Sequence, residues 1–373
     1  MSGFAAGHAS GEDWRECVNE CLAELEWSPG SSLGFVYWTD QLTSYLPDIL
    51  ATLREYTGIA DWVGTVAMGI CGNSGVHVDE PALSVMIGEF PADSFRVFTP
   101  IKNSGMCDLD EATKDWIVAR SSYLALVHAD QHSRSLDQSI NSLVNFMEGG
   151  FLIGGVGSAR GRCPQVAGGV VQGGLSGVLF SENVAVSTRL SQGCSPIGPC
   201  RTVTSGRSNI ILAIDNRPAL EVFKEDIGEV LARDLRRVAG YIFAGFSVPG
   251  SDTGEYLVRN LVGVDQNSGA LAVGEYVKPG DRMMFCRRDP QTAVDDMERM
   301  LKELTRSLNG QKPKGGIYIS CLARGPNQFE PPDLEIILIR RYLGEFPLTG
   351  FFANGEISHD RLYAYTGVLT LFL

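Results

Sequence analysis

The chain has 373 residues, of which 44% are hydrophobic and 20% are charged, and it carries a formal net charge of -13 with a pI of about 4.9. A chain of this length suits about two domains, and its apolar fraction is large enough for a substantial core. The acidic balance argues against nucleic acid and anionic membrane surfaces as partners, because both require a basic face.

The cysteine content and the distribution of apolar residues indicate a cellular compartment. Nine cysteines, an odd number, lie in apolar or glycine-rich segments, which is typical of reduced thiols. The N-terminal residues lack the basic flank and apolar run of a signal peptide. No apolar run approaches the roughly 18–20 residues needed to span a bilayer. We therefore expect a cytoplasmic protein with no membrane-spanning segment.

Hydrophobic patterning predicts a helix at residues 13–25, after a short polar segment that we expect to be ordered only in part. A buried strand and an amphipathic helix follow. Two more strands complete the series, and a turn-rich stretch at Cys71–Gly75 lies between them. These four elements are predicted at 33–38, 42–56, 62–70 and 82–87.

The same order of strand, helix, strand and strand recurs twice, and each time a glycine-rich polar turn follows the second strand. Because the residue identities match poorly, the repeat is one of pattern. The second copy is predicted at 123–127, 136–147, 151–156 and 174–180, and the third at 317–322, 334–342, 351–354 and 366–373.

A longer region separates the second and third copies. Asn216 and Pro218 are typical of a helix start, and the helix is predicted over 219–238 with an interruption at Gly228. Strands separated by hairpin-type turns follow, and then an amphipathic helix. These elements are predicted at 241–248, 256–264, 271–277, 282–286 and 293–308.

Together the elements predict an α/β protein of two related halves. Each half is expected to contain mixed, largely antiparallel sheets packed face to face with helices outside, because every sheet must bury a face. We place the boundary between the halves near 200–215, which gives domains at 13–210 and 211–373.

The turn after the second copy's second strand is the first candidate site. Its sequence, Gly154 to Gly161, fits neither the G-x-G-x-x-G spacing nor a Walker motif. Two interpretations remain for Gly155 and Gly157. They allow close strand packing, or they leave room beside Ser158 for a small ligand with Arg160 as its charged anchor.

The third copy supplies the other candidates. Glu356, with Asn354, lies at a strand end between glycines, where its carboxylate either binds a ligand's amine or caps a turn. Cys321 and Arg324 leave an enzyme open as an alternative, since a nearby cation lowers the pKa of a reactive thiol. Glu356 is the other residue that such an enzyme would use.

Haem-based gas sensing is a further alternative, because histidine is the usual axial ligand. Two of the five histidines are suitably placed in the predicted fold: His77 follows the Gly72–Gly75 turn, and His128 ends a core strand. Neither has flanking residues that require haem, so the main expectation is that the protein binds no cofactor.

Several motifs in order resemble the FIST family, with both its N-terminal and C-terminal regions, here 13–210 and 211–373. The resemblance covers roughly residues 15–373. The motifs that carry it are Asp61–Gly64 (DWVG), Gly154–Gly157 (GGVG), Tyr256–Asp265 (YLVRNLVGVD), Gly280–Asp289 (GDRMMFCRRD), Ser320–Gly325 (SCLARG) and Gly350–Ile357 (GFFANGEI).

The resemblance implies a sensory module that binds small ligands, amino acids among them, and some family members bind haem and respond to nitric oxide. Fused kinase, chemotaxis-type or F-box segments are absent from this sequence, so we expect signalling through a separate protein partner. The expected function is non-catalytic binding of an amino acid or small carboxylate. The expected ligand-binding residues are Gly155, Gly157, Ser158, Arg160, Cys321, Arg324, Asn354 and Glu356.

Overall fold

The computed structural model describes residues 3–25, 30–102, 108–233, 235–238, 240–248 and 256–373. Its chain divides into two compact units. The first comprises Met1–Ser191, Met297–Leu362 and Thr366–Leu373, and the second comprises Gln192–Asp296 and Tyr363–Tyr365. In sequence, most of the second unit is therefore an insertion within the first.

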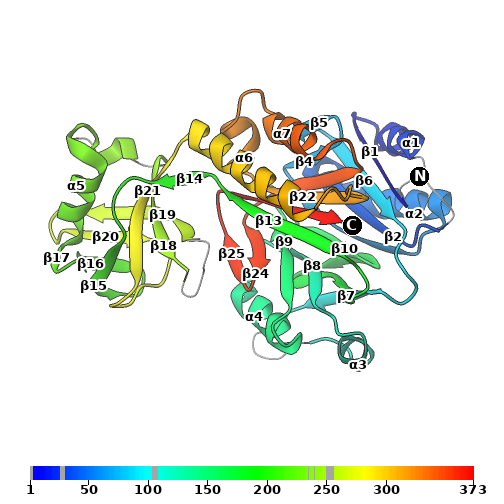
Figure 1. The fold of residues 1–373 in the computed structure, drawn as a ribbon, viewed down its shortest axis with the longest axis horizontal. Coiled ribbons are helices and arrows are strands. Elements are labelled where there is room, and N and C mark those ends of the chain that lie inside the picture. The colour runs from blue at the N-terminus through cyan, green and yellow to red at the C-terminus, as the bar shows by residue number, and fades with distance from the viewer. Residues whose placement is uncertain (1–2, 26–29, 103–107, 234, 239, 249–255) are drawn as a thin grey trace. The chain divides into compact units, whose positions relative to one another are not determined.

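The first unit consists of three copies of one series of elements (Figure 1). The first copy contains β1 (Phe4–Ser10), α1 (Trp14–Glu24), β2 (Leu33–Thr39), the 3-10 helix η1 (Asp40–Tyr45), α2 (Leu46–Thr57), β3 (Asp61–Ala67), β4 (Gly69–Gly72), β5 (Gly75–Val78) and β6 (Ala82–Gly88). The second contains β7 (Phe95–Ile101), α3 (Glu111–Ala119), β8 (Leu124–Ala129), α4 (Leu136–Phe146), β9 (Phe151–Val156), β10 (Pro164–Ala167), β11 (Gly169–Gln172) and β12 (Leu175–Phe180).

The third copy is interrupted after its first strand by the residues of the second unit. It contains β13 (Val186–Gln192), α6 (Pro290–Ser307), β22 (Gly315–Cys321), η3 (Gly325–Asn327), α7 (Leu334–Leu343), β23 (Leu348–Ala353), β24 (Glu356–His359), β25 (Arg361–Tyr363) and β26 (Thr366–Phe372). The predicted strand–helix–strand–strand unit is thus present three times. In each copy an additional strand and helix precede the unit, and a two-stranded hairpin lies between its second and third strands.

Each copy forms most of one sheet, and the hairpin of another copy completes that sheet. The strand orders are β1-β6-β2-β3-β10-β11, β25-β24-β9-β8-β12-β7 and β13-β26-β22-β23-β4-β5. The hairpin of the second copy therefore extends the first sheet, that of the third copy extends the second sheet, and that of the first copy extends the third sheet. This cyclic exchange connects all three copies through backbone hydrogen bonds.

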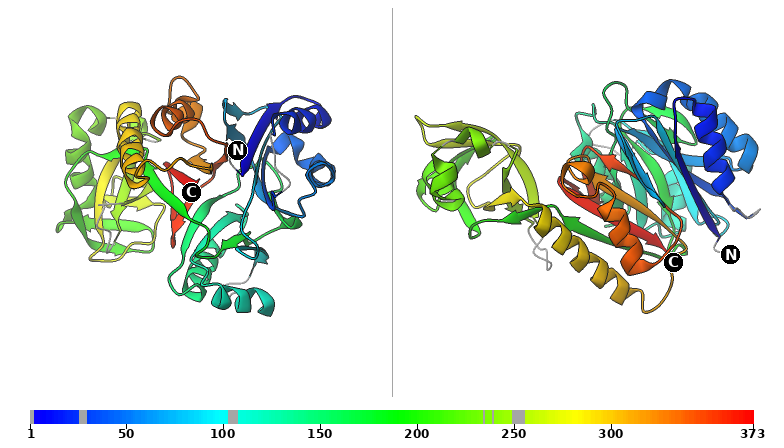
Figure 2. Two further views of the ribbon diagram at one scale, coloured as in Figure 1. Left: turned by 45° about the vertical axis from the view of Figure 1, so that its right-hand side comes forward. Right: turned by 90° about the horizontal axis from the view of Figure 1, so that it is seen from above.

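The three sheets share one apolar core, which contains Phe35 of β2, Leu126 of β8 and Ile319 of β22. Helices pack on the other faces: α1 and α2 against the first sheet, and α3 and α4 against the second. Phe4 and Phe372, near the two ends of the chain, stack in this core with ring centroids 5.2 Å apart. Figure 2 shows where the two ends lie.

Close approach of the two parallel strands in each copy requires a glycine at one register position. An added Cβ atom there would lie 1.7–1.9 Å from a carbonyl oxygen of the adjoining strand, a separation that no side chain tolerates. The three pairs are Gly64 with Val36, Gly154 with Val127 and Gly350 with Tyr318. The shared glycine explains part of the glycine enrichment near the strands.

The second unit contains β14 (Cys194–Pro196), β15 (Arg201–Arg207), β16 (Ile210–Ile214), β17 (Arg217–Pro218), α5 (Ala219–Ala232), η2 (Leu235–Val238), β18 (Ile242–Ser247), β19 (Tyr256–Asp265), β20 (Ala270–Val273) and β21 (Arg282–Arg288). Pairing of β21 with both β15 and β18 closes six of these strands into a ring. Helix α5 packs on this sheet through Phe223, and Gly228 interrupts the helix as predicted.

The predicted α/β class, with mixed and largely antiparallel sheets and outer helices, is confirmed. Parallel pairing occurs in β2–β3, β8–β9 and β22–β23. The expectation of a partly ordered N-terminal segment is wrong for Phe4–Ser10, because this segment pairs along its whole length with β6. In the described part of the chain, no helix is both long and apolar enough to cross a membrane.

Candidate functional site

The carboxyl ends of β3, β9 and β23 meet at Ser158, a buried residue that lies two positions after the end of β9. Its hydroxyl donates to the Phe352 carbonyl oxygen at 2.7 Å and accepts from the Met68 backbone N–H at 2.9 Å. Its own N–H donates to the Val66 carbonyl oxygen at 3.2 Å. One serine therefore connects the strand ends of all three copies.

The two predicted turns, after β9 and after β23, lie side by side. The Asn354 N–H donates to the Val156 carbonyl oxygen at 2.9 Å, and the Val156 N–H donates to the Gly355 carbonyl oxygen at 2.9 Å. Glu356 is paired with Gly155 between β24 and β9. The Asn354 side chain is exposed, whereas Glu356 is fully buried, so the two predicted polar partners have different surroundings.

Gly155 and Gly157 contact side chains instead of open space. A Cβ atom on Gly155 would lie 2.8 Å from Cβ of Ala353, and one on Gly157 would lie 2.7 Å from Oγ1 of Thr65. The geometry at both glycines matches the close-packing interpretation. Their role is to let the strands of different copies approach at the centre of the unit.

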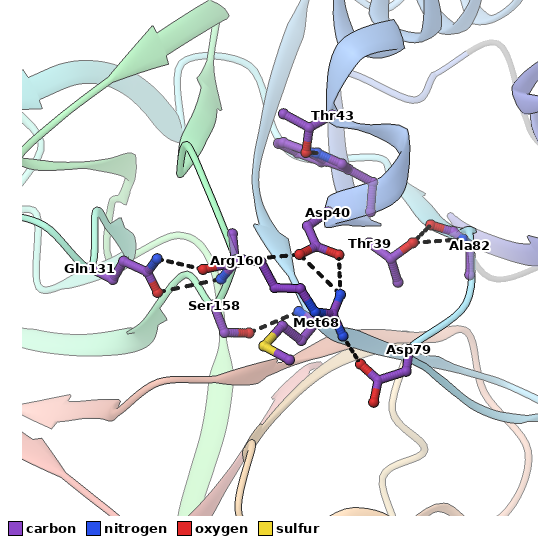
Figure 3. A network of polar contacts seen from close by, with 11 residues as sticks. Thr39, Asp40, Thr43, Met68, Asp79, Ala82, Gln131, Ser158 and Arg160 are labelled. Atoms are coloured by element: carbon purple, nitrogen blue, oxygen red, sulfur yellow. Dashed lines mark hydrogen bonds and ion pairs between the residues drawn. The ribbon is translucent and has the colours of Figure 1, made fainter.

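Arg160 is already engaged by two aspartates from the first copy (Figure 3). Its Nη1 atom lies 2.9 Å from Oδ1 of Asp40, and its backbone N–H donates to Oδ2 of the same carboxylate at 3.0 Å. Its Nη2 atom bonds Asp79. Gln131 holds the preceding residue by donating to the Ala159 carbonyl oxygen at 2.7 Å. These contacts fix the loop, and an anionic ligand at Arg160 would have to compete with both carboxylates.

A buried ion pair lies next to the end of β22. Nε of Arg324 donates to Oε1 of Glu335 at 2.9 Å, and Tyr318 and Ser320 donate to the same carboxylate at 2.5 Å and 3.0 Å. Burial disfavours the charged form of Arg324, but the facing Glu335 carboxylate outweighs this effect and the pKa of Arg324 is raised. The guanidinium therefore stays charged inside the protein.

Glu356 lies near this ion pair, and its ionisation is finely balanced. Burial raises the pKa of Glu356 to about 7, although hydrogen bonds from Thr366, the Cys321 thiol and the charge of Arg324 all act to lower it. Thr366 donates to Oε2 from its hydroxyl at 2.7 Å and from its N–H at 3.0 Å. Glu356 is consequently a carboxyl group at these strand ends with a pKa close to neutrality.

Three buried side-chain atoms around Arg324 lack a hydrogen-bond partner of acceptable geometry among the described residues. They are Nη2 of Arg324, Oε1 of Glu356 and Oγ of Ser191. Ser191 is adjacent, since its carbonyl oxygen accepts from Nη1 of Arg324 at 3.3 Å. Nη2 lies 2.8 Å from Oε1 of Glu335, but only as an ion pair. Buried polar atoms rarely lack a hydrogen bond in this way, and a group without one calls for an explanation such as a bound molecule.

Cys321, the nucleophile of the enzyme alternative, is 7% exposed at the end of β22. Arg324 does lie in the turn after that strand, as the alternative requires, but its guanidinium pairs with Glu335. A reactive cysteine requires exposure together with an electropositive neighbour. The structure provides neither condition fully at Cys321.

The two histidines of the haem alternative have different surroundings. His128 is fully buried, with its Nε2 3.2 Å from the Tyr37 hydroxyl and its pKa lowered to about 3 by burial. The His77 side chain is 22% exposed, and its Nδ1 lies 2.8 Å from Glu80. Across the described residues, no group of three or more His, Cys, Asp or Glu side chains is arranged to hold a metal ion.

Sequence reasoning missed the partner of Arg324. Glu335 lies within α7, whose first six residues, LEIILI, are otherwise apolar, and the Glu335 side chain faces the core. A single carboxylate in an apolar stretch is the signal that was available, because a buried charge requires a partner. Ser191 carried no comparable signal, since it comes from the end of β13, far away in the sequence.

Comparison with known proteins places the chain in a family. It is 30% identical to an uncharacterized protein of Mycobacterium tuberculosis strain H37Rv, with 99% of each chain covered, and equally to its counterpart in strain CDC 1551. An uncharacterized protein of Mycobacterium bovis is 27% identical over 89% of this chain and 88% of its own.

Family models match nearly the whole sequence. Residues 32–217 match the FIST N domain and residues 219–359 match the FIST C domain. FIST domains are generally sensory or signal-transduction domains. The chain therefore belongs to the FIST family and carries both of its domains.

Proposed function

We propose that this protein is a non-catalytic sensor of a small zwitterionic molecule, an amino acid in the first instance, held at the strand ends beside Arg324 and Glu356. The observation that carries the proposal is the set of buried atoms around the Arg324 guanidinium that lack a hydrogen-bond partner, among which Nη2 of Arg324 has only its ion pair with Glu335. The membership in a sensory family supports the functional class.

The chemistry of the atoms that lack a hydrogen bond favours an amino acid. Nη2 of Arg324 is a charged donor that suits a carboxylate, and Oε1 of Glu356 is an acceptor that suits an ammonium group. A simple carboxylate ligand would bond only to Nη2 of Arg324, and ionised Glu356 would repel that ligand. A zwitterion can bond to both Nη2 of Arg324 and Oε1 of Glu356, and it brings no net charge into the core.

The raised pKa of Glu356 offers a route from binding to signalling. An ammonium group near the carboxylate would favour its ionised form, so binding near pH 7 would release a proton and add a second negative charge to the cluster. Such a change can alter the packing of α7, which carries Glu335. The signal then passes to a separate protein partner in the cytoplasm.

The proposal is tested by a thermal-shift screen of the common L-amino acids, together with acetate, succinate and methylamine. Binding to the native state raises the melting temperature, and the stabilisation grows with the logarithm of the ratio of ligand concentration to dissociation constant. We expect at least one amino acid to stabilise the wild type, and acetate and methylamine to do so much less. If no amino acid stabilises the protein, or if acetate stabilises it equally well, the zwitterion model is wrong.

Glu356→Gln is the informative variant, because it keeps the size of the side chain and removes its charge. We expect this variant to fold and to lose the shift caused by the amino acid. Glu345→Gln is a matched control, since Glu345 pairs with Arg340 at the surface. A Glu356→Gln variant that keeps the full shift would remove Glu356 from the site.

A further inference from the structure

A cavity lies at the ends of β8 and β9 that are opposite the strand-end cluster of Arg324 and Glu356. It has a volume of about 470 Å³ and is bordered by the residues that connect α3 to β8 and α4 to β9. These six-residue strands are each ~20 Å long, so the cavity is well separated from the strand-end cluster. Its volume falls within the range of small-molecule sites, roughly 300–1,000 Å³.

The walls of this cavity are mainly aromatic and aliphatic. Tyr123, Phe146 and Phe151 border it, and Ile117 and Met147 add apolar surface. Two of these rings are held in place by contacts with other residues. The Tyr123 hydroxyl donates to the Val184 carbonyl oxygen at 2.5 Å, and the Phe151 ring lies 3.8 Å from that of His359. Fixed aromatic faces bind flat apolar groups and also cations.

The electrostatics at the cavity favour a positive charge. Helices α3 and α4 both end there, and helix carboxyl termini carry partial negative charge. Glu148 borders the cavity, and no lysine or arginine is among its described lining residues. The nearby Arg120, which caps α3, forms an ion pair with Asp93. The local field is therefore negative.

We propose that this cavity binds an arylalkyl amine or a similar small organic cation, with the ring against Phe146 and Phe151 and the ammonium near Glu148. This site is independent of the strand-end cluster, with which it shares no residue. The ligand class follows from a negative rim around an aromatic interior.

The test is titration calorimetry of the full chain with phenethylammonium, and with phenylacetate as the probe of opposite charge. Phenylacetate has the same ring and a similar size, so a difference between the two isolates the charge. We expect saturable binding of phenethylammonium that weakens as salt is added, and no binding of phenylacetate. Equal binding of both probes would overturn the proposal, as would binding of neither.

Variants locate the binding. Glu148→Gln should weaken phenethylammonium binding by up to about fivefold, because it removes the only carboxylate among the described lining residues and exposed ion pairs are weak. Glu182→Gln, at another exposed position of the same unit, should leave the affinity unchanged. An affinity that is unaffected by Glu148→Gln, or equally reduced by Glu182→Gln, would place the cation elsewhere.

The strand-end variant separates this inference from the proposed function. Glu356→Gln should retain phenethylammonium binding and lose only the amino-acid response. Failure of the amino-acid screen would therefore leave the cavity proposal standing. If Glu356→Gln abolishes phenethylammonium binding while Glu148→Gln does not, the amine binds at the strand ends and the cavity proposal is wrong.

Discussion

Arg324 and Glu335 form an ion pair whose side chains are 0% and 2% exposed, with Nη2 of Arg324 2.8 Å from Oε1 of Glu335. Arg324 directly precedes η3, and Glu335 follows η3 within α7. A hydrophobic pair of similar volume is often as stable as a buried ion pair. The presence of charges here therefore agrees with a role in binding.

Breaking this pair should destabilise the protein strongly. Glu335→Leu leaves the Arg324 charge buried and uncompensated, which we expect to cost about 3–5 kcal/mol of unfolding free energy. The double variant with Arg324→Leu should recover most of that loss, because both charges are then gone. Urea denaturation gives the unfolding free energies of the wild type, the single variant and the double variant. A double variant as unstable as the single one would show that the lost hydrogen bonds of the cluster matter more than the unpaired charge.

A surface pair provides the comparison for that experiment. Arg340 and Glu345 pair at exposed positions, with side chains 42% and 70% exposed. Exposed ion pairs contribute about 0–1 kcal/mol, so Glu345→Leu should change the unfolding free energy by less than ~1 kcal/mol. The contrast between the two substitutions measures the effect of burial.

The raised pKa of Glu356 predicts a pH dependence of stability. Its folded pKa of about 7 lies above the unfolded value of 4.5, so the native state holds the extra proton between those pH values. The contribution of Glu356 to stability should be largest below pH 4.5 and should fall as pH rises to about 7. The fall amounts to up to ~3 kcal/mol.

His128 titrates with the opposite sign, so a variant is needed to isolate Glu356. The folded pKa of His128 is about 3, below its unfolded 6.5, so its contribution rises as pH rises through that interval. The difference in unfolding free energy between wild type and Glu356→Gln cancels the His128 effect. If that difference stays constant from pH 4.5 to 7, the pKa of Glu356 is not raised.

Alanine at the shared glycine position should disturb the sheets. At Gly154 a Cβ atom would lie 1.9 Å from the Val127 carbonyl oxygen, and overpacking of this kind costs about 1–3 kcal/mol or more. Gly161→Ala is the control, because no atom lies within 4 Å of a Cβ there. The melting temperatures of the Gly154→Ala and Gly161→Ala variants measure the two effects. Equal melting temperatures would mean that β8 and β9 separate readily, against the close pairing described above.

The inserted unit should be removable without loss of the three-sheet core. The Gln192 N–H donates to Oδ2 of Asp296 at 2.6 Å, so the two ends of the insertion are adjacent and a short linker can join them. We expect a variant with residues 194–294 replaced by a glycine-rich linker to unfold cooperatively, with dispersed amide signals in its NMR spectrum. A molten or insoluble product would show that the first unit depends on the second.

The strand ends were the most predictable part of the candidate site. Glycine-rich polar turns after apolar runs located Ser158 and Glu356, because those turns follow buried strands in every copy. The exchange of hairpins between copies was not predictable, since β4, β10 and β24 are each only four residues long and their partners lie in other copies. Short strands carry too little periodicity to specify a partner.

Buried charge was the other limit of sequence reasoning. Arg324 was selected as an open anchor, but its pairing with Glu335 depends on how η3 and α7 fold back over β22. His8 belongs to the N-terminal segment that the sequence predicts to be only partly ordered, yet it lies in β1 and is 8% exposed. Small residues such as Gly7, which lets β1 pass under α1, do not have the hydrophobic pattern of a strand.

The central claim is that Arg324 and Glu356 together bind an amino acid. Saturation-transfer difference NMR on an equimolar mixture of L-amino acids tests it most directly, because ligands are detected in competition and without labels. The account predicts transfer to one or a few amino acids with the wild type, and none with Glu356→Gln, while Glu345→Gln behaves as the wild type. Transfer that persists in folded Glu356→Gln, or no transfer to any amino acid with the wild type, would contradict the account.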